Sequence, residues 1–119
     1  MRRLWLAAGW AMVAAIVYGS VMHSPPSLGF EQSDKLEHLG SYGLVMFWFA
    51  QLYPERGVRL GYALGLAALG VALEFLQGWL GYRDFEVADM VADAAGVALG
   101  WGAALIVPIA LPAAGTGTR

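Results

Sequence analysis

Four long apolar runs, separated by short polar segments, dominate the pattern of this chain. Residues 4–22 hold 19 positions without a charged side chain. As an α-helix they span roughly 28 Å, close to the hydrocarbon thickness of a bilayer. The later runs predict three more helices, at about residues 34–53, 58–80 and 87–111. The pattern therefore predicts an all-α protein, built as a four-helix transmembrane bundle.

Prolines and glycines mark the ends of these runs. Residues 23–33 contain two prolines and a glycine, so we expect a loop there. Pro54 separates the second run from the third by only a few residues, so these helices are expected to be antiparallel neighbours. Pro108 is expected to kink the end of the fourth helix, and residues 113–119 to form a flexible tail. We predict one domain over residues 1–112.

The composition supports a membrane protein. Hydrophobic residues make up 59% of the chain and charged residues 13%, about half the charged share of a typical soluble domain. Cysteine is absent, which excludes a disulfide, a zinc–thiolate site and a thiol nucleophile. The sequence has no basic patch, so nucleic acid is not an expected partner.

The charged residues sort to opposite sides of the predicted bundle. An up-and-down path places eight of the nine acids on one side and five of the seven bases on the other. The acids are Glu31, Asp34, Glu37, Glu74, Asp84, Glu86, Asp89 and Asp93, and the bases are Arg2, Arg3, Arg56, Arg59 and Arg119. Because cytoplasmic loops carry an excess of Lys and Arg, both termini are expected in the cytoplasm. The acidic side would then face outward from a bacterial cytoplasmic membrane.

Several acids lie within the apolar runs or beside them, which needs an explanation. A charge near the bilayer centre costs roughly 2.5–3.5 kcal/mol on insertion scales. Glu74 interrupts an apolar run, whereas Asp34 and His38 are four residues apart and share a helical face. If three helix ends meet, one shallow polar pocket would collect Asp34, His38, Glu74, Gln77, Arg83, Asp89 and Asp93.

Several of these residues also have a structural interpretation. Asp34 and Glu37 have the spacing of a capping box. Lys35 is expected to extend to the lipid headgroups, and Asp89 suits the positive N-terminal end of a helix. Asp84 and Glu86 are interpreted as solvated loop acids, and Arg83 as a cation that balances neighbouring carboxylates.

Small residues are expected to bring the helices together. Gly57, Gly61 and Gly65 recur at four-residue steps and are followed by Gly70. Ala92, Gly96, Gly100 and Ala104 recur at the same four-residue step. Small residues at this spacing allow close helix–helix approach in lipid. We expect both rows to be packing faces.

The order of polar residues resembles that of the VanZ-like family of small bacterial membrane proteins. The resemblance covers residues 34–104. It is carried by D-K-x-x-H at 34–38, E-x-x-Q at 74–77, Arg83, and D-x-x-x-D-x-x-G-x-x-x-G at 89–100. It implies a four-helix membrane domain with a polar cluster at one membrane side. It also implies a role in the cell envelope, since the founding member lowers sensitivity to the glycopeptide teicoplanin. Many members have Asn where this chain has Asp93, and the resemblance implies no particular reaction.

We therefore predict that Asp34, His38, Glu74 and Asp89 carry any catalysis, with Lys35, Gln77, Arg83 and Asp93 completing a binding network. The expected partners are membrane lipids and a lipid-linked envelope precursor. The residues also leave open whether the chain forms a homo-oligomer. No cofactor is expected unless the carboxylates and histidine hold a divalent cation. The residues leave open whether the chain is an enzyme. The alternatives are a non-enzymatic scaffold with a structural polar network and, with less support, a proton-coupled transporter.

Overall fold

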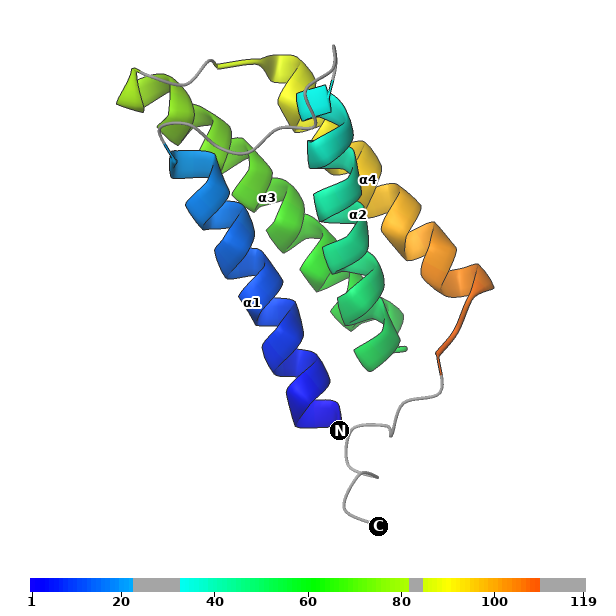
Figure 1. The fold of residues 1–119 in the computed structure, drawn as a ribbon. Coiled ribbons are helices and arrows are strands. Elements are labelled where there is room, and N and C mark those ends of the chain that lie inside the picture. Colours follow the sequence, from blue (N-terminus) through cyan, green and yellow to red (C-terminus); the bar gives the residue numbers. More distant parts are fainter. Residues whose placement is uncertain (23–32, 82–84, 110–119) are drawn as a thin grey trace.

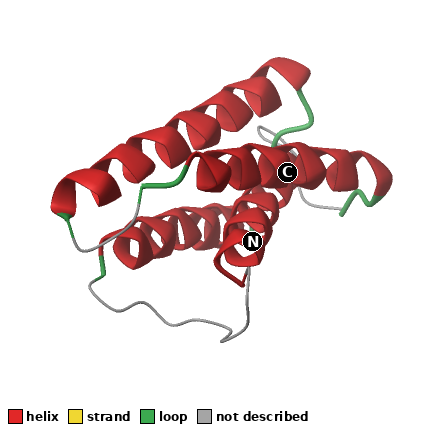
Figure 2. Ribbon diagram, turned by 90° about the horizontal axis from the view of Figure 1, so that it is seen from above, coloured by secondary structure: helices red, strands yellow, loops and turns green. Residues whose placement is uncertain are grey.

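A computed structural model describes residues 1–22, 33–81 and 85–109, without the side chains of Ser33 and Asp34. Four α-helices follow one another: α1 (Arg2–Val21), α2 (Ser33–Leu52), α3 (Arg56–Leu80) and α4 (Val87–Ile106). Helices α1 and α3 run in one direction and α2 and α4 in the other (Figure 1). All regular structure in the described segments is helical (Figure 2), which confirms the all-α prediction.

Three of the helices, α1, α3 and α4, are long and apolar enough to cross a membrane. The fourth, α2, carries Lys35, Glu37 and His38 in its first turns. Helix α2 is nevertheless the most enclosed, with Tyr42, Val45, Met46, Phe49, Ala50 and Leu52 buried. In a membrane domain, ionisable side chains are found on helices that face the bundle interior, and α2 fits this rule. Of the four predicted membrane-spanning helices, three are therefore confirmed as long and apolar enough to cross a membrane.

Several helix ends differ from those predicted. Helix α3 starts at Arg56, directly after the turn at Pro54 and Glu55. Helix α4 stops at Ile106, not near residue 111. Proline disfavours the helical conformation in the residue before it, and Val107 accordingly has φ −123° and ψ 78°. Within the predicted loop 23–33, residue 33 already belongs to α2. Residues 23–32 and the predicted tail 113–119 lie outside the described residues.

Helices α2 and α4 make the closest contact in the bundle, and glycines allow it. A Cβ on Gly43 would lie 3.1 Å from the carbonyl oxygen of Gly96. A Cβ on Gly96 would collide with the carbonyl oxygen of Leu39, and one on Gly100 with that of Gly43. The glycines of the fourth helix are thus a packing face, as predicted.

Of the glycines expected to form a packing face on α3, Gly70 packs, whereas Gly57, Gly61 and Gly65 do not, and for these three the prediction was wrong. Gly57, Gly61 and Gly65 have no atom within 4 Å of the position a Cβ would take. Helix α3 buries a different face, which includes Leu66, Gly70 and Leu73. The row faces away because α3 contacts α4 through Gly70, beside Asp93.

Helix α1 is attached to α2 by a tryptophan pair. The rings of Trp5 and Trp48 stack with centroids 3.7 Å apart. Each indole N–H donates to the other residue's carbonyl oxygen, from Trp48 at 2.6 Å and from Trp5 at 3.1 Å. Gly9 lets the ring of Phe49 approach α1, because a Cβ there would be only 2.9 Å from it.

The end of α2 also fixes the chain that follows α4. The Gln51 amide donates to the carbonyl oxygen of Val107 at 3.0 Å and accepts the backbone N–H of Ile109 at 2.7 Å. Arg59 donates to the carbonyl oxygens of Ala50 and Tyr53, which satisfies the end of α2.

Candidate functional site

Most acidic side chains of the described residues, together with Lys35, His38 and Gln77, belong to one end of the bundle, where α2 and α4 begin and α1 and α3 end (Figure 1). We call this group the polar cluster: Lys35, His38, Glu74, Gln77, Glu86, Asp89 and Asp93. Five of these residues were predicted to meet in one pocket, Lys35 was predicted to belong to the binding network, and Glu86 is an addition. The side chain of Asp34 and the whole of Arg83 lie outside the described residues.

His38 lies between two carboxylates of α4. Its Nδ1 is 2.6 Å from Oδ1 of Asp93, and its Nε2 is 3.8 Å from Oδ2 of Asp89. A carboxylate oxygen can only accept, so the ring donates from Nδ1 and a neutral imidazole keeps Nε2 as an acceptor. The side chain of His38 is 20% exposed, whereas that of Asp93 is 3% exposed. A buried acid therefore orients an imidazole ring that is itself partly exposed.

Lys35 bridges two acids of the fourth helix region. Its Nζ lies 2.8 Å from Oδ1 of Asp89 and 3.1 Å from Oε1 of Glu86. The prediction that Lys35 extends to the headgroups is therefore corrected: the ion pairs hold the ammonium inside the polar cluster. Glu86 is likewise a partner in the cluster and not merely a solvated loop acid. The Asp89 side chain is only 7% exposed, so its pairing with Lys35 offsets much of the cost of burying a charge.

The register of α2 against α4 explains both pairings. The helices run in the same direction, so each step along α2 faces an equal step along α4. Lys35 faces Asp89, His38 faces Asp93, and Gly43 faces Gly96 and Gly100. The glycines let the two backbones touch, and this contact sets which polar side chains meet two turns away. The glycine spacing was the one sequence signal for these pairs.

Glu74 has a structural partner at the start of α4. Its side chain is almost fully buried, with 1% of the residue exposed. Its Oε2 accepts the backbone N–H of Glu86, the N-cap residue of α4, at 2.6 Å. The first N–H groups of a helix lack partners within the helix and carry partial positive charge. Glu74 therefore joins α3 to the N-terminus of α4.

Gln77 and Gly70 complete the contacts of α3. The Gln77 amide donates to the carbonyl oxygen of Ser20 at 3.0 Å, which ties α3 to the end of α1. A Cβ on Gly70 would lie 2.6 Å from Oδ2 of Asp93. Gly70 thus provides the space that the buried Asp93 carboxylate occupies.

The polar cluster carries an excess of negative charge. Its described side chains include four carboxyls, those of Glu74, Glu86, Asp89 and Asp93, against one lysine and one histidine. A cationic or amine-bearing group would be attracted to such a site. No three His, Asp or Glu side chains in the described parts of the chain are arranged to hold a metal ion. Since the Asp34 side chain is outside those parts, the divalent cation stays a prediction.

Comparison of the chain with protein-family models, with curated proteins and with solved structures finds no match. The resemblance to the VanZ-like family therefore stays a prediction that rests on the residues quoted for it. The chemistry of the site has to be argued from the contacts of the polar cluster itself.

Proposed function

We propose that the chain is a multi-pass protein of the bacterial cytoplasmic membrane whose polar cluster binds or modifies a lipid headgroup or lipid-linked component of the cell envelope. The observation that carries this proposal is the His38–Asp93 pair, in which a buried carboxylate orients a partly exposed imidazole. An ionisable group that is held in place within a membrane domain marks a functional site.

The proposed orientation places both termini in the cytoplasm and the polar cluster outside. Its support is the excess of arginine at the other end, where Arg2, Arg3, Arg56 and Arg59 lie on α1 and α3. Helix α2 completes the bundle as the fourth span, because its polar start coincides with the polar end of the other helices.

The polar cluster offers two kinds of contact to a headgroup. Nε2 of His38 can accept a proton from a hydroxyl or a water molecule, with Asp93 stabilising the imidazolium that forms. Lys35 and the partly exposed Glu86 offer a cation and an anion beside it. A ligand with an amine would suit the carboxylate excess, and one with a phosphate would replace Glu86 at Lys35.

Envelope profiling of a deletion strain tests the proposal. The strain is complemented with the wild-type chain, with His38→Gln, with Glu74→Gln, or with Glu55→Gln as a matched carboxyl-to-amide control at the opposite end. We expect changed envelope lipids in the deletion strain that the wild type and Glu55→Gln restore and the two site variants do not. Full restoration by both site variants, at normal protein levels in the membrane, would refute a functional site.

The resemblance to the VanZ-like family adds a second readout in the same strains. If this chain shares the effect of the founding member, the deletion strain becomes more sensitive to teicoplanin-type glycopeptides. The variants should follow the order seen in the lipid profile. Unchanged sensitivity together with a changed lipid profile would separate the envelope role from antibiotic resistance.

A non-enzymatic scaffold is the second candidate, and one observation favours it. Asp93 pairs with His38, Asp89 with Lys35, and Glu74 with the N–H of Glu86, so these carboxylates have partners within the chain. A network of this kind can serve only to specify the bundle. The scaffold predicts that Glu74→Gln restores the phenotype fully, because the amide oxygen still accepts the N–H of Glu86.

A further inference from the structure

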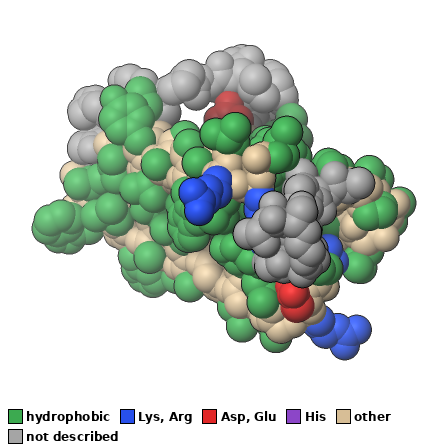
Figure 3. Space-filling model, turned by 90° about the horizontal axis from the view of Figure 1, so that it is seen from below, with side chains coloured by type: hydrophobic (Ala, Val, Ile, Leu, Met, Phe, Trp, Pro, Cys, Tyr) green, Lys and Arg blue, Asp and Glu red, His purple; other side chains and the backbone are tan. Residues whose placement is uncertain are grey.

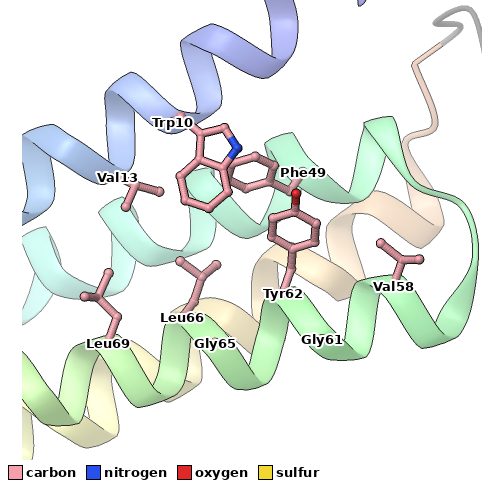
Figure 4. Close-up of a pocket in the computed structure, with 9 residues that line it drawn as sticks. All are labelled: Trp10, Val13, Phe49, Val58, Gly61, Tyr62, Gly65, Leu66 and Leu69. Atoms are coloured by element: carbon pink, nitrogen blue, oxygen red, sulfur yellow. The ribbon is translucent and has the colours of Figure 1, made fainter. Parts of the chain in front are cut away.

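An apolar groove runs between α1 and α3, toward the end of the bundle that lies away from the polar cluster. Its volume is about 630 Å³, within the range of sites that bind small molecules. Trp10 and Val13 of α1 form one wall, Phe49 of α2 forms the floor, and the first half of α3 forms the other wall (Figure 4).

The groove is open because side chains and glycines on its two walls keep α1 and α3 from packing directly against each other there. Trp10 packs edge-on against Phe49, with ring centroids 5.3 Å apart, and lies 6.3 Å from the ring of Tyr62. These rings keep α1 away from α3. Gly61 and Gly65 line the opposite wall and leave empty the space that larger side chains would fill. In a bilayer, the acyl chain of a neighbouring lipid can fill such a space.

Basic residues stand at the outer end of the groove. The Arg2 guanidinium lies 5.1 Å from the ring centroid of Tyr53. Tyr53 stacks on Tyr62 at 5.4 Å, and Tyr62 lines the groove. Arg3, Arg56 and Arg59 belong to the same end of the bundle. Among the described residues, Glu55 is the only acidic residue at this end. Figure 3 shows basic side chains standing among the apolar surface at this end.

We propose that the groove binds one acyl chain of an anionic phospholipid, whose phosphate lies among the arginines. The apolar lining suits the chain, and the arginine excess suits the anionic headgroup, since juxtamembrane basic residues attract anionic lipid. A second copy of the protein fits less well. A closed dimer in a membrane presents the same surface from both chains, which would bring two arginine-rich ends together. This inference rests on the proposed membrane location and not on the chemistry of the polar cluster.

Native mass spectrometry of the full chain, released from nanodiscs of equimolar phosphatidylglycerol and phosphatidylethanolamine, tests the inference. We expect one phosphatidylglycerol to be retained per wild-type chain. Gly65→Leu should lower this retention by about tenfold, because the leucine would fill the groove without meeting another atom at its Cβ. Gly102→Leu is the matched control, since Gly102 of α4 also has open space and lies outside the groove. Arg2→Gln should lower the preference for phosphatidylglycerol while some lipid is still bound.

Each contrary result has a defined meaning. Undiminished retention in Gly65→Leu, with normal helicity by circular dichroism, would overturn the groove as the lipid site. Equal retention of the two lipids by the wild type would overturn the role of the arginines. A dimer that Gly65→Leu dissociates would show a second copy in the groove instead. Glu74→Gln should retain lipid normally in all cases, so a failure here is distinct from a failure of the proposed function.

Discussion

Asp89 is a buried acid whose nearest cationic partner is Lys35. Its side chain is 7% exposed, and it lies 2.8 Å from Lys35 and 3.8 Å from His38. Removing one member of a buried ion pair leaves an uncompensated charge, which is costly. The same geometry makes Lys35 a structural element of the site, beyond any contact with a ligand.

Lys35→Gln should therefore destabilise the fold by about 1–3 kcal/mol, below the range for fully buried pairs because Lys35 is partly exposed. The free energy of unfolding in detergent, followed by circular dichroism, measures this loss. Combining Lys35→Gln with Asp89→Asn should recover most of it, since the uncompensated charge is then removed. A double variant as unstable as the sum of both single variants would contradict the pairing.

Gly70 offers a second test at the scale of one residue. Gly70→Ala places a methyl group 2.6 Å from Oδ2 of Asp93, and overpacking of this kind costs about 1–3 kcal/mol. Gly61→Ala is the matched change in the same helix. It meets no atom within 4 Å and should be neutral or stabilise the helix by up to about 1 kcal/mol. Equal effects of the two changes on the unfolding free energy would contradict the placement of Asp93.

At the scale of the elements, the contact between α2 and α4 organises the polar cluster. Gly96→Leu should prevent the bundle from forming, because its Cβ meets the backbone of Leu39, which cannot move aside easily. Gly102→Leu should fold normally. Size-exclusion profiles and helicity in detergent compare the two variants. A folded Gly96→Leu protein, with His38 and Asp93 still coupled in double-variant unfolding measurements, would contradict this packing.

The helices could largely be predicted from the sequence, but their contacts could not. Apolar runs fix where a helix exists, and the ends at Leu52 and Leu80 came within one residue of the prediction. The end of α4 was misplaced because Pro108 acts on the residue before it. The glycine rows of α3 and α4 have the same spacing, and only the α4 row is buried. The relative positions of all four helices decide which glycine row is buried. The spacing of glycines within one helix cannot predict those positions.

The sequence predicted which residues belong to the polar cluster better than it predicted which of them pair with each other. Glu74, Asp89 and Asp93 share one end because an up-and-down path places them there. The partner of His38 was not foreseen. Asp34 has the helical spacing to His38, and that predicted pair stays untested because the Asp34 side chain lies outside the described residues. Among the described side chains, Asp93 reaches His38 through the parallel register of α2 and α4. Glu86 was missed because a loop acid next to a helix start has no periodic pattern that predicts contact with Lys35.

At the scale of the whole molecule, the two ends of the bundle differ in charge and therefore in the partners they suit. One end holds buried and half-buried acids around His38, and the other holds an excess of arginine beside an apolar groove. Helices of 20 residues span about 30 Å, the thickness of a bilayer core. The ends would then lie at the two membrane surfaces, and the orientation that we propose puts the polar cluster on the side away from the cytoplasm.

Single-cysteine labelling tests this arrangement most directly, because the chain has no cysteine of its own. Glu86→Cys places a thiol at the exposed rim of the polar cluster, and Glu55→Cys places one in the exposed turn at the other end. A membrane-impermeant maleimide applied to intact spheroplasts should label the Glu86→Cys protein. The Glu55→Cys protein should be labelled only after permeabilisation. The reverse pattern would place the polar cluster in the cytoplasm and contradict its proposed role at the outer surface.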